Sequence, residues 1–370
     1  MKVTLVYNLK KDPKDECAPI DYYSEFDSME TIEAITSAIR SQGYEVSLAE
    51  ANNQIIDRLL EQVPDIVFNI AEGSSGPNRE SQIPAILDYL GIPYTGSDVL
   101  ALALALNKGI AKRLFMHYEI PTPRFQVFKD KDAKLEEGLK FPLIVKPNCE
   151  GSAKGITRDS VVHNEARLYQ EVEKVMAVYK QETLVEEFID GKELTVGVLG
   201  NGKFLDLPIL EIDFSNCRKS GEYFYSWRMK EYQGNEELGL NPQFYCPARL
   251  DRETARRVKE TAYKVHNVLG CRDISRVDIR LSRENVPYVL EINPLPGLDP
   301  KESNFPVITR SSGMDYNKLI GKILELAIKR YKIEEFVKQK NSCTNRTTTY
   351  INPVENHISR KTEEGGKNVV

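Results

Sequence analysis

The chain has 370 residues, enough for two or three domains, and its 41% hydrophobic and 28% charged residues are ordinary for a globular protein. The net charge of −5 argues against nucleic acid as the main partner, and no apolar run of about 18 residues predicts a membrane-spanning helix. The six cysteines and four histidines show no metal or redox spacing, and the start is too briefly apolar for a signal peptide. We therefore expect reduced thiols, no zinc site and a cytoplasmic location.

Residues 1–97 alternate short apolar runs with helical spacing. We expect strands at 3–7, 44–48 and 65–69 and helices at 29–40, 55–60 and 81–90. This alternation predicts an α/β domain in which helices cover both faces of a parallel sheet. Such sheets bind ligands beyond the carboxyl ends of their strands, so Glu72, Arg79 and Glu80 could contact a small zwitterion. The same three residues could equally cap and solvate the start of a helix.

Residues 98–185 form the second predicted segment. We expect helices at 100–106 and 108–118 and strands at 125–128 and 142–147. Lys108 precedes a helix and Lys146 ends an apolar strand, so each ammonium group could meet an anionic phosphate or could be an ordinary surface lysine. In the loop at 148–156, two glycines would let backbone amides close over phosphates, although a hairpin turn is the alternative.

Residues 186–332 make up the third predicted segment. We expect strands at 184–189, 193–199 and 205–212 and helices at 252–269 and 315–331. The turn between the first two strands could offer backbone groups to an adenine edge and a carboxylate to a ribose. Residues 215–242 are polar and aromatic, and so long a stretch without regular structure is typical of a lid or binding loop. The polar stretch 333–370 is too poor in large apolar groups to order itself, so we expect a disordered tail.

The stretch 276–297 contains the most informative pattern. Two alternating apolar runs flank a short polar loop, which predicts a β-hairpin. A four-residue loop would set Arg276 opposite Glu291. Residues two apart share a strand face, so Asp278 and Asn293 would join them there. Two carboxylates and an amide suit Mg²⁺, whose charge would compensate theirs, whereas a salt-bridged face exposed to solvent is the alternative.

The order of these parts resembles the ATP-grasp superfamily and, within it, the D-alanine–D-alanine ligases. The resemblance covers roughly residues 60–330. It rests on LGIPYTGSD (90–98), LNKGIAKRLF (106–115), FPLIVKPNCEGSAKGI (141–156), VEEFIDGKELTVGVLG (185–200), FYCPA (244–248), SRVDIRL (275–281) and EINPLPG (291–297), which are specific together and not singly. It implies that the N-terminal α/β domain precedes two α+β subdomains, 98–185 and 186–332, that clasp ATP.

The resemblance also implies roles for single residues. ATP would contact Lys108, Lys146, Glu150, Glu186, Phe188, Ile189 and Glu193; Asp278, Glu291 and Asn293 would bind two Mg²⁺ ions, or Mn²⁺ in their place; Ser152 would lie over the γ-phosphate; Arg276 and the Gly297 amide would stabilise an oxyanion; and Ser303 would contact the second amino acid. In the lid, Lys230 would reach the γ-phosphate, although Arg228 and Tyr232 compete for that role. A homodimer through the first domain would suit the family.

The sequence departs from these ligases where they hold their amino acids. No glutamate matching their early substrate-binding residue can be placed in 9–27, their His-Gly stretch is replaced by 69–80, and Ala153 replaces the second serine of their loop. We therefore expect an ATP-dependent ligase that joins amino-acid-like molecules through an acyl phosphate. It is either a D-alanine–D-alanine ligase of cell-wall synthesis or a specialised ligase of a natural-product pathway. Phosphoryl transfer without amide formation and non-catalytic nucleotide binding remain as alternatives.

Overall fold

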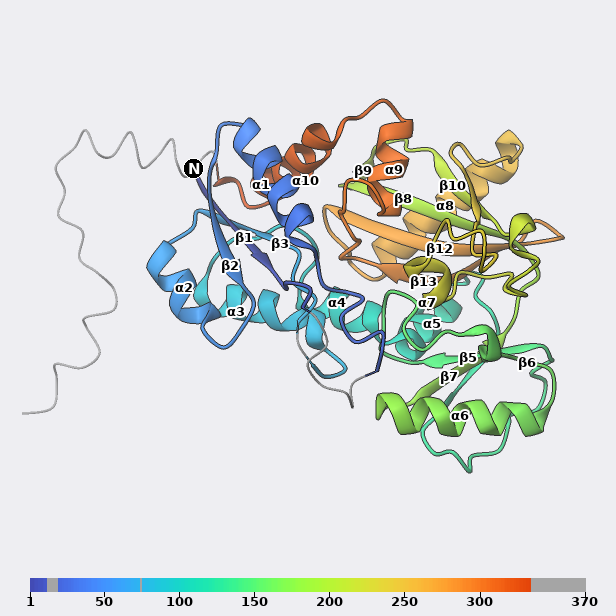
Figure 1. Ribbon diagram of the computed structural model, residues 1–370. Coiled ribbons are helices and arrows are strands. Elements are labelled where there is room, and N and C mark those ends of the chain that lie inside the picture. Colours follow the sequence, from blue (N-terminus) through green and yellow to red (C-terminus); the bar gives the residue numbers. More distant parts are fainter. Residues whose placement is uncertain (12–18, 74, 334–370) are drawn as a thin grey trace, which may run out of the picture. The chain divides into compact units, whose positions relative to one another are not determined.

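The computed structural model describes residues 1–11, 19–73 and 75–333 (Figure 1). Residues 1–327 form one compact unit, and the chain from 328 onwards belongs to a second. The predicted tail at 333–370 therefore lies outside the described residues except for its first residue, and the domain boundaries stay predictions. Within the described residues, no helix is both long and apolar enough to cross a membrane.

A three-stranded parallel sheet opens the fold, which confirms the prediction for the N-terminal segment. Its strands β1 (Lys2–Tyr7), β2 (Glu45–Glu50) and β3 (Ile66–Asn69) lie in the order β2-β1-β3. The chain steps to one side of β1 and then to the other, so right-handed crossovers put helices α1 (Met29–Ser41) and α2 (Ile55–Gln62) on opposite faces. Helix α3 (Gln82–Leu90) follows β3. The loop between β3 and α3 thus leaves the carboxyl edge of the sheet, where a ligand site was expected.

The next segment forms an antiparallel sheet that is covered by one helix (Figure 1). Helices α4 (Val99–Leu106) and α5 (Lys108–His117) lead into strands β4 (Phe125–Phe128), β5 (Leu143–Pro147), β6 (Val161–Val162) and β7 (Thr183–Glu187), in the order β4-β7-β5-β6. Helix α6 (Glu165–Tyr179), which the sequence analysis did not place, packs on this sheet through Leu168, Val172 and Val175. Their spacing is that of one helix face, so periodicity could have found this helix.

The third sheet carries the predicted hairpin. Strands β8 (Gly191–Asn201), β10 (Ile209–Asp213), β11 (Gln243–Tyr245), β12 (Ile274–Ser282) and β13 (Pro287–Asn293) are antiparallel in the order β11-β10-β8-β12-β13, and β9 (Lys203–Phe204) pairs with β8. Helix α8 (Arg252–Val268) packs against one face through Val258, Ala262 and Val265. Helices α9 (Asn304–Ser311) and α10 (Tyr316–Arg330) follow the hairpin. One face of β12 and β13 is therefore covered, and the other faces the site.

The hairpin exists as predicted, but its register was predicted wrongly. Arg276 pairs with Asn293 and Asp278 pairs with Glu291, whereas a four-residue loop would have set Arg276 opposite Glu291. The turn is longer than assumed, and a bulge next to Asp278 adds one more residue to β13. The four polar side chains still share one face, because Val277 between Arg276 and Asp278 belongs to the core under α8.

Residues 215–242 are folded rather than structureless. They contain the short helix α7 (Trp227–Glu231) and a small apolar core that includes Cys217, Met229 and Leu240. The single tryptophan, Trp227, anchors the segment: its Nε1 donates to Ser24 Oγ at 2.8 Å and its amide donates to Ile156 O at 3.1 Å. The predicted lid is therefore attached both to the loop at 9–27, which we call the early loop, and to the loop at 148–156, which we call the glycine loop.

A substitution at Gly191, at the start of β8, would test how closely β8 packs against β12. Its φ is +153°, and a Cβ there would lie 1.9 Å from Leu281 O on β12. We expect Gly191→Ala to lower the free energy of unfolding by about 1–3 kcal/mol, because the backbone must shift away. Urea titration measures this. Gly202→Ala is the matched control, since its φ is also positive but no atom lies within 4 Å of the added Cβ. Equal losses in both variants would contradict the packing argument.

Candidate active site

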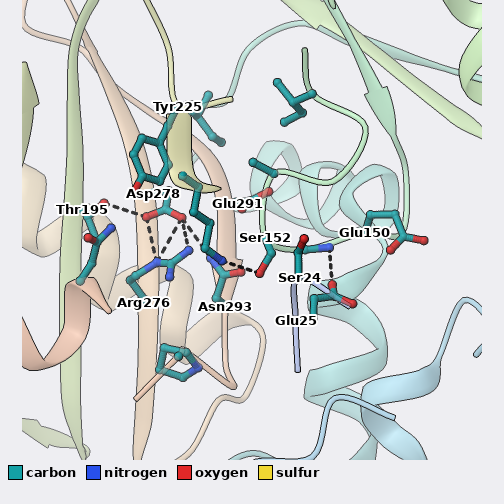
Figure 2. Close-up of a pocket in the computed structure, with 18 of the residues that line it drawn as sticks. Ser24, Glu25, Glu150, Ser152, Thr195, Tyr225, Arg276, Asp278, Glu291 and Asn293 are labelled. Atoms are coloured by element: carbon teal, nitrogen blue, oxygen red, sulfur yellow. Dashed lines mark hydrogen bonds and ion pairs between the residues drawn. The ribbon is translucent and has the colours of Figure 1, made fainter. Parts of the chain in front are cut away.

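One cavity of about 580 Å³ gathers nearly all of the residues predicted to act (Figure 2). Its walls come from the early loop, the loop after β3, the start of α5, the glycine loop, β7, β8 and the hairpin of β12 and β13. The predicted residues that line it are Glu72, Glu80, Lys108, Lys146, Glu150, Ser152, Glu186, Phe188, Ile189, Glu193, Lys230, Arg276, Asp278, Glu291, Asn293, Gly297 and Ser303. Arg79 is the predicted residue that does not line it.

Asp278 is the centre of the polar face on the hairpin. Its carboxylate accepts from Arg276 Nη2 at 2.8 Å, from Thr195 Oγ1 at 2.9 Å and from Asn293 Nδ2 at 3.1 Å, as Figure 2 shows. Thr195 lies on β8, so three neighbouring strands hold one carboxylate. Hydrogen bonds from three directions keep this group in a defined position within the cavity.

Glu291, which lies opposite Asp278, is surrounded by positive charge. Lys108 Nζ lies 3.3 Å from Glu291 Oε2. Burial alone would raise the pKa of Glu291, but Lys108, Lys146 and Arg276 lower it to about 2. The carboxylate is therefore ionised at neutral pH, as a metal ligand has to be.

The oxygen atoms on this hairpin fit a hard divalent cation. Asp278 and Glu291 are paired across the ladder, and Asn293 lies on the same face of β13. Mg²⁺ prefers such oxygen ligands and keeps several waters or phosphate oxygens. In the part of the chain that the structure describes, no group of three or more His, Cys, Asp or Glu side chains could hold a metal ion. An ion at the hairpin would thus need further ligands from a bound phosphate or from water.

Glu186 on β7 is buried between two lysines. Its carboxylate lies 2.6 Å from Lys146 Nζ and 2.7 Å from Lys112 Nζ. Burial alone would raise the pKa of Glu186, but the two ammonium groups lower it, while burial lowers the pKa of Lys112 to about 8. Lys112 was not among the residues predicted from the sequence. It lies one helical turn after Lys108 on α5, and that spacing was the available signal.

Arg280 is a second residue that the sequence analysis did not name. Its guanidinium lies 4.9 Å from the centre of the Phe188 ring and 3.7 Å from a Glu193 carboxylate oxygen. It also donates to two backbone carbonyls, at 3.0 Å each. Burial raises the pKa of Glu193. Arg280 therefore positions the residues predicted for adenine and ribose, and its place two residues after Asp278 on β12 was the available signal.

Glu25 lies in the loop at 9–27 and is a further residue that was not named from the sequence. Its carboxylate accepts from Arg79 Nη2 at 2.6 Å and from the Gly151 amide at 2.8 Å, and it lies 3.3 Å from Lys154 Nζ. Burial alone would raise the pKa of Glu25, but Arg79 and Lys154 lower it to about 2. Arg79 also donates to Cys149 O at 2.8 Å. Arg79 thus contacts the glycine loop through Cys149 O and is not among the residues that line the cavity.

The glycine loop meets the predicted lid at Ser152. Lys230 Nζ on α7 donates to Ser152 Oγ at 2.8 Å. Three lid residues were candidates for the contact with the γ-phosphate. Lys230 lines the cavity, whereas Arg228 and Tyr232 do not, and Arg228 pairs with Glu222 at 3.3 Å. Burial lowers the pKa of Lys230. The geometry therefore favours Lys230 among the three.

Three carboxylates on the side of the early loop and the β3–α3 loop form what we call the acidic wall: Asp27, Glu72 and Glu80. Burial, with Asp299 next, raises the pKa of Asp27 to about 7. Burial, with Glu25 next, raises the pKa of Glu80 to about 7. Burial, with Glu80 and Glu25 next, raises the pKa of Glu72 well above its ordinary value. Arg79, Lys108 and Lys230 are the cations that lower these pKa values, and their effect is smaller than that of burial.

Gly297 and Ser303 lie in the loop that follows the hairpin. Ser303 Oγ accepts from the Asp299 amide at 3.1 Å, and a Cβ on Gly297 would lie 2.8 Å from that oxygen. Both residues line the cavity. The loop therefore brings a close-packed backbone and a hydroxyl group to the same side of the site, and the roles predicted for them stay predictions.

Known proteins resemble this chain along most of its length. The family model described as "D-ala D-ala ligase C-terminus" matches residues 110–325. The D-alanine–D-alanine ligase of Methylacidiphilum infernorum is 36% identical over 309 residues, which cover 82% of this chain and 92% of that protein. The uncharacterised protein y4sG of Sinorhizobium fredii is 33% identical over 307 residues, which cover 81% of this chain and 88% of that protein.

A solved structure is also similar. The D-alanine–D-alanine ligase from Bacillus anthracis, in complex with ATP, aligns with a TM-score of 0.68 over 90% of this chain and 99% of that chain. Its sequence identity is 23%, so this likeness bears on the fold alone. It confirms the predicted arrangement of an N-terminal α/β part and two α+β parts.

The raised pKa of Glu80 should make the stability of the protein depend on pH. Its pKa rises from an ordinary 4.5 to about 7 on folding. Its contribution to stability is therefore present below about pH 4.5 and is lost as the pH rises through about 7. We expect Glu80→Gln to remove this loss. Between about pH 5 and pH 8, the free energy of unfolding should therefore fall by about 1–3 kcal/mol less in Glu80→Gln than in the wild type. Urea unfolding across that range measures it. Glu137→Gln, at an exposed glutamate, should keep the wild-type slope, and an unchanged slope in Glu80→Gln would contradict the shift.

Proposed function

Because the chain belongs to the D-alanine–D-alanine ligase family, we propose that it joins the carboxylate of one amino-acid-like molecule to the amine of another through an acyl phosphate. It is an ATP-dependent ligase that forms carbon–nitrogen bonds. The observation that carries the proposal is the cavity in which the Asp278–Glu291 carboxylates, two lysines suited to phosphate and the Ser152–Lys230 contact face one another. This is the set of groups that phosphoryl transfer to a carboxylate needs.

ATP would occupy the part of the cavity between β7 and the hairpin. We assign to it Lys108, Lys146, Glu150, Glu186, Phe188, Ile189 and Glu193, all of which line the cavity. The ammonium groups of Lys108 and Lys146 would neutralise phosphate charge. Asp278, Glu291 and Asn293 would hold two Mg²⁺ ions, for which Mn²⁺ could substitute, and bound Mg²⁺ would supply further charge neutralisation at the phosphates.

The first step would form the acyl phosphate. An oxygen of the substrate carboxylate attacks the γ-phosphorus of ATP, the bond from that phosphorus to the bridging oxygen breaks, and ADP leaves. Ser152, held by Lys230, would lie over the transferring group together with the amides of the glycine loop. Glu72 at the acidic wall would bind the ammonium group of this first substrate.

The second step would form the amide. The amine of the second substrate attacks the acyl carbon, a tetrahedral oxyanion forms, inorganic phosphate leaves, and the new amide nitrogen loses a proton. Arg276 and the Gly297 amide would stabilise the oxyanion, and Ser303 would contact the carboxylate of the second amino acid. Preorganised donors of this kind usually make the largest single contribution to such a reaction.

The identity of the two substrates separates two versions of this function. The similarity to D-alanine–D-alanine ligases favours synthesis of D-alanyl-D-alanine. The acidic wall, in the region where the sequence departs from those ligases, favours a different pair of amino acids. A homodimer and a cytoplasmic location stay predictions.

Phosphate release from ATP and Mg²⁺ against a panel of D- and L-amino acids, singly and in pairs, tests the proposal. We expect release that requires a carboxylate and an amine, with a dipeptide identified by mass spectrometry. A dipeptide from D-alanine alone would identify the cell-wall reaction, and release with another pair would identify a specialised ligase. A phosphorylated product that forms without any amine would contradict amide formation.

Asp278→Asn and Glu291→Gln test the metal assignment. We expect each variant to lower kcat by about 100-fold or more, because a charged ligand becomes a neutral one. Thermal unfolding should show that each variant is folded. Asp206→Asn is the control, since Asp206 is exposed and pairs with Lys259 away from the cavity. Wild-type turnover in either ligand variant would remove the assignment.

A further inference from the structure

The acidic wall has more carboxyl groups than one α-ammonium group needs. Asp27, Glu72 and Glu80 line one cavity, and their side chains have no hydrogen-bond or ion-pair partner among the residues that the structure describes. The nearest guanidinium is already engaged, since Arg79 Nη2 lies 2.6 Å from Glu25. The wall therefore offers three carboxylates to whatever enters the cavity.

Among the three residues of the acidic wall, Glu80 gives the clearest evidence for a cationic ligand. Its side chain is only 8% exposed, yet it lines the cavity. It belongs to the short 3₁₀ helix Arg79–Ser81, which packs at the start of α3, so its backbone is held in place. A buried carboxylate without a partner is costly when ionised. A cationic ligand would remove that cost, and a neutral one would not.

The wall is also extended, so it can meet more than one positive group. Glu80 lies on the side of Lys108 and Glu291, toward the proposed phosphate site. Asp27 lies on the side of Asp299 and Lys230, toward the loop after the hairpin. One carboxylate is enough for the α-ammonium group of an amino acid, so the remaining carboxylates are free to bind a second ammonium group.

We propose that one substrate of this ligase is a diamino acid, or a related carboxylic acid with two amines, whose second ammonium group binds at Glu80. This inference rests on the proposed ligase function and names the class of its substrate. It requires no new chemical step, because the second amine is recognised and does not react.

The test uses pairs of acids that differ only by an ammonium group in place of a methyl group. Such pairs are 2,3-diaminopropionate with 2-aminobutyrate, 2,4-diaminobutyrate with norvaline, and ornithine with norleucine, each in both chiralities. We expect kcat/KM for phosphate release to be at least about tenfold higher for the diamino member of one pair, which corresponds to one good charge-assisted contact. Equal or lower values in every pair would overturn the inference and leave the ligase function standing.

Variants then locate the contact. Glu80→Gln should bring the preference for the diamino acid close to one. Glu80→Asp serves as the second variant if Glu80→Gln does not fold, because it moves the carboxylate back by one methylene and should lower the preference. Glu231→Gln is the matched control, because Glu231 also lines the cavity but is exposed and lies 3.9 Å from Lys10. An unchanged preference in the Glu80 variant that folds, or an equal loss in Glu231→Gln, would overturn the assignment to Glu80.

A binding measurement separates the two proposals. The melting temperature is measured with Mg²⁺, a non-hydrolysable ATP analogue and each acid of a pair. A rise with the diamino acid that depends on Glu80, without phosphate release for any acid, would keep the cationic site and contradict the ligase function. Neither phosphate release nor a rise in melting temperature would contradict both.

Discussion

The ion pair between Glu25 and Arg79 links the parts of the chain on which the cavity depends. Their side chains are 4% and 6% exposed, and the closest nitrogen and oxygen atoms lie 2.6 Å apart. Glu25 also accepts from the Gly151 amide, so the early loop, the loop after β3 and the glycine loop share one carboxylate. Removing one partner of such a pair costs about 3–5 kcal/mol, because the other charge stays buried. The positions of these three segments are therefore interdependent.

Charge divides the cavity into two unlike halves. On the hairpin side each carboxylate has a cation beside it, since Glu186 meets two lysines, Glu291 meets a third and Asp278 meets an arginine. On the opposite side Arg79 pairs with Glu25 and Lys154 pairs with Glu150, and none of the ion pairs among the described residues involves the acidic wall. The hairpin side, where carboxylates are paired with cations, suits a nucleotide that binds together with metal ions. The side of the acidic wall, where carboxyl groups have no ion pair, suits a substrate that carries positive charge.

Periodicity was enough to predict most strands and helices, because one face of each packs into a core. The features that escaped prediction depend on contacts that leave no local pattern. Glu25 and Arg79 are 54 residues apart, and Glu25 lies in a loop without periodicity. The hairpin register differed because neither the length of the turn nor a bulge can be read from an alternating sequence. Lys112 and Arg280 are different, since each repeats the spacing of a residue that was named.

The two halves of the cavity also differ in how their residues are held, which would let one half change while the other is kept. Asp278, Glu291 and Asn293 lie on paired strands, where a slip of one residue would turn every side chain to the wrong face. The acidic wall lies outside the sheets, with Asp27 and Glu72 in connecting segments and Glu80 in a short 3₁₀ helix, and such segments can change without disturbing a sheet. A family built in this way can keep its ATP chemistry while it changes its amino acid.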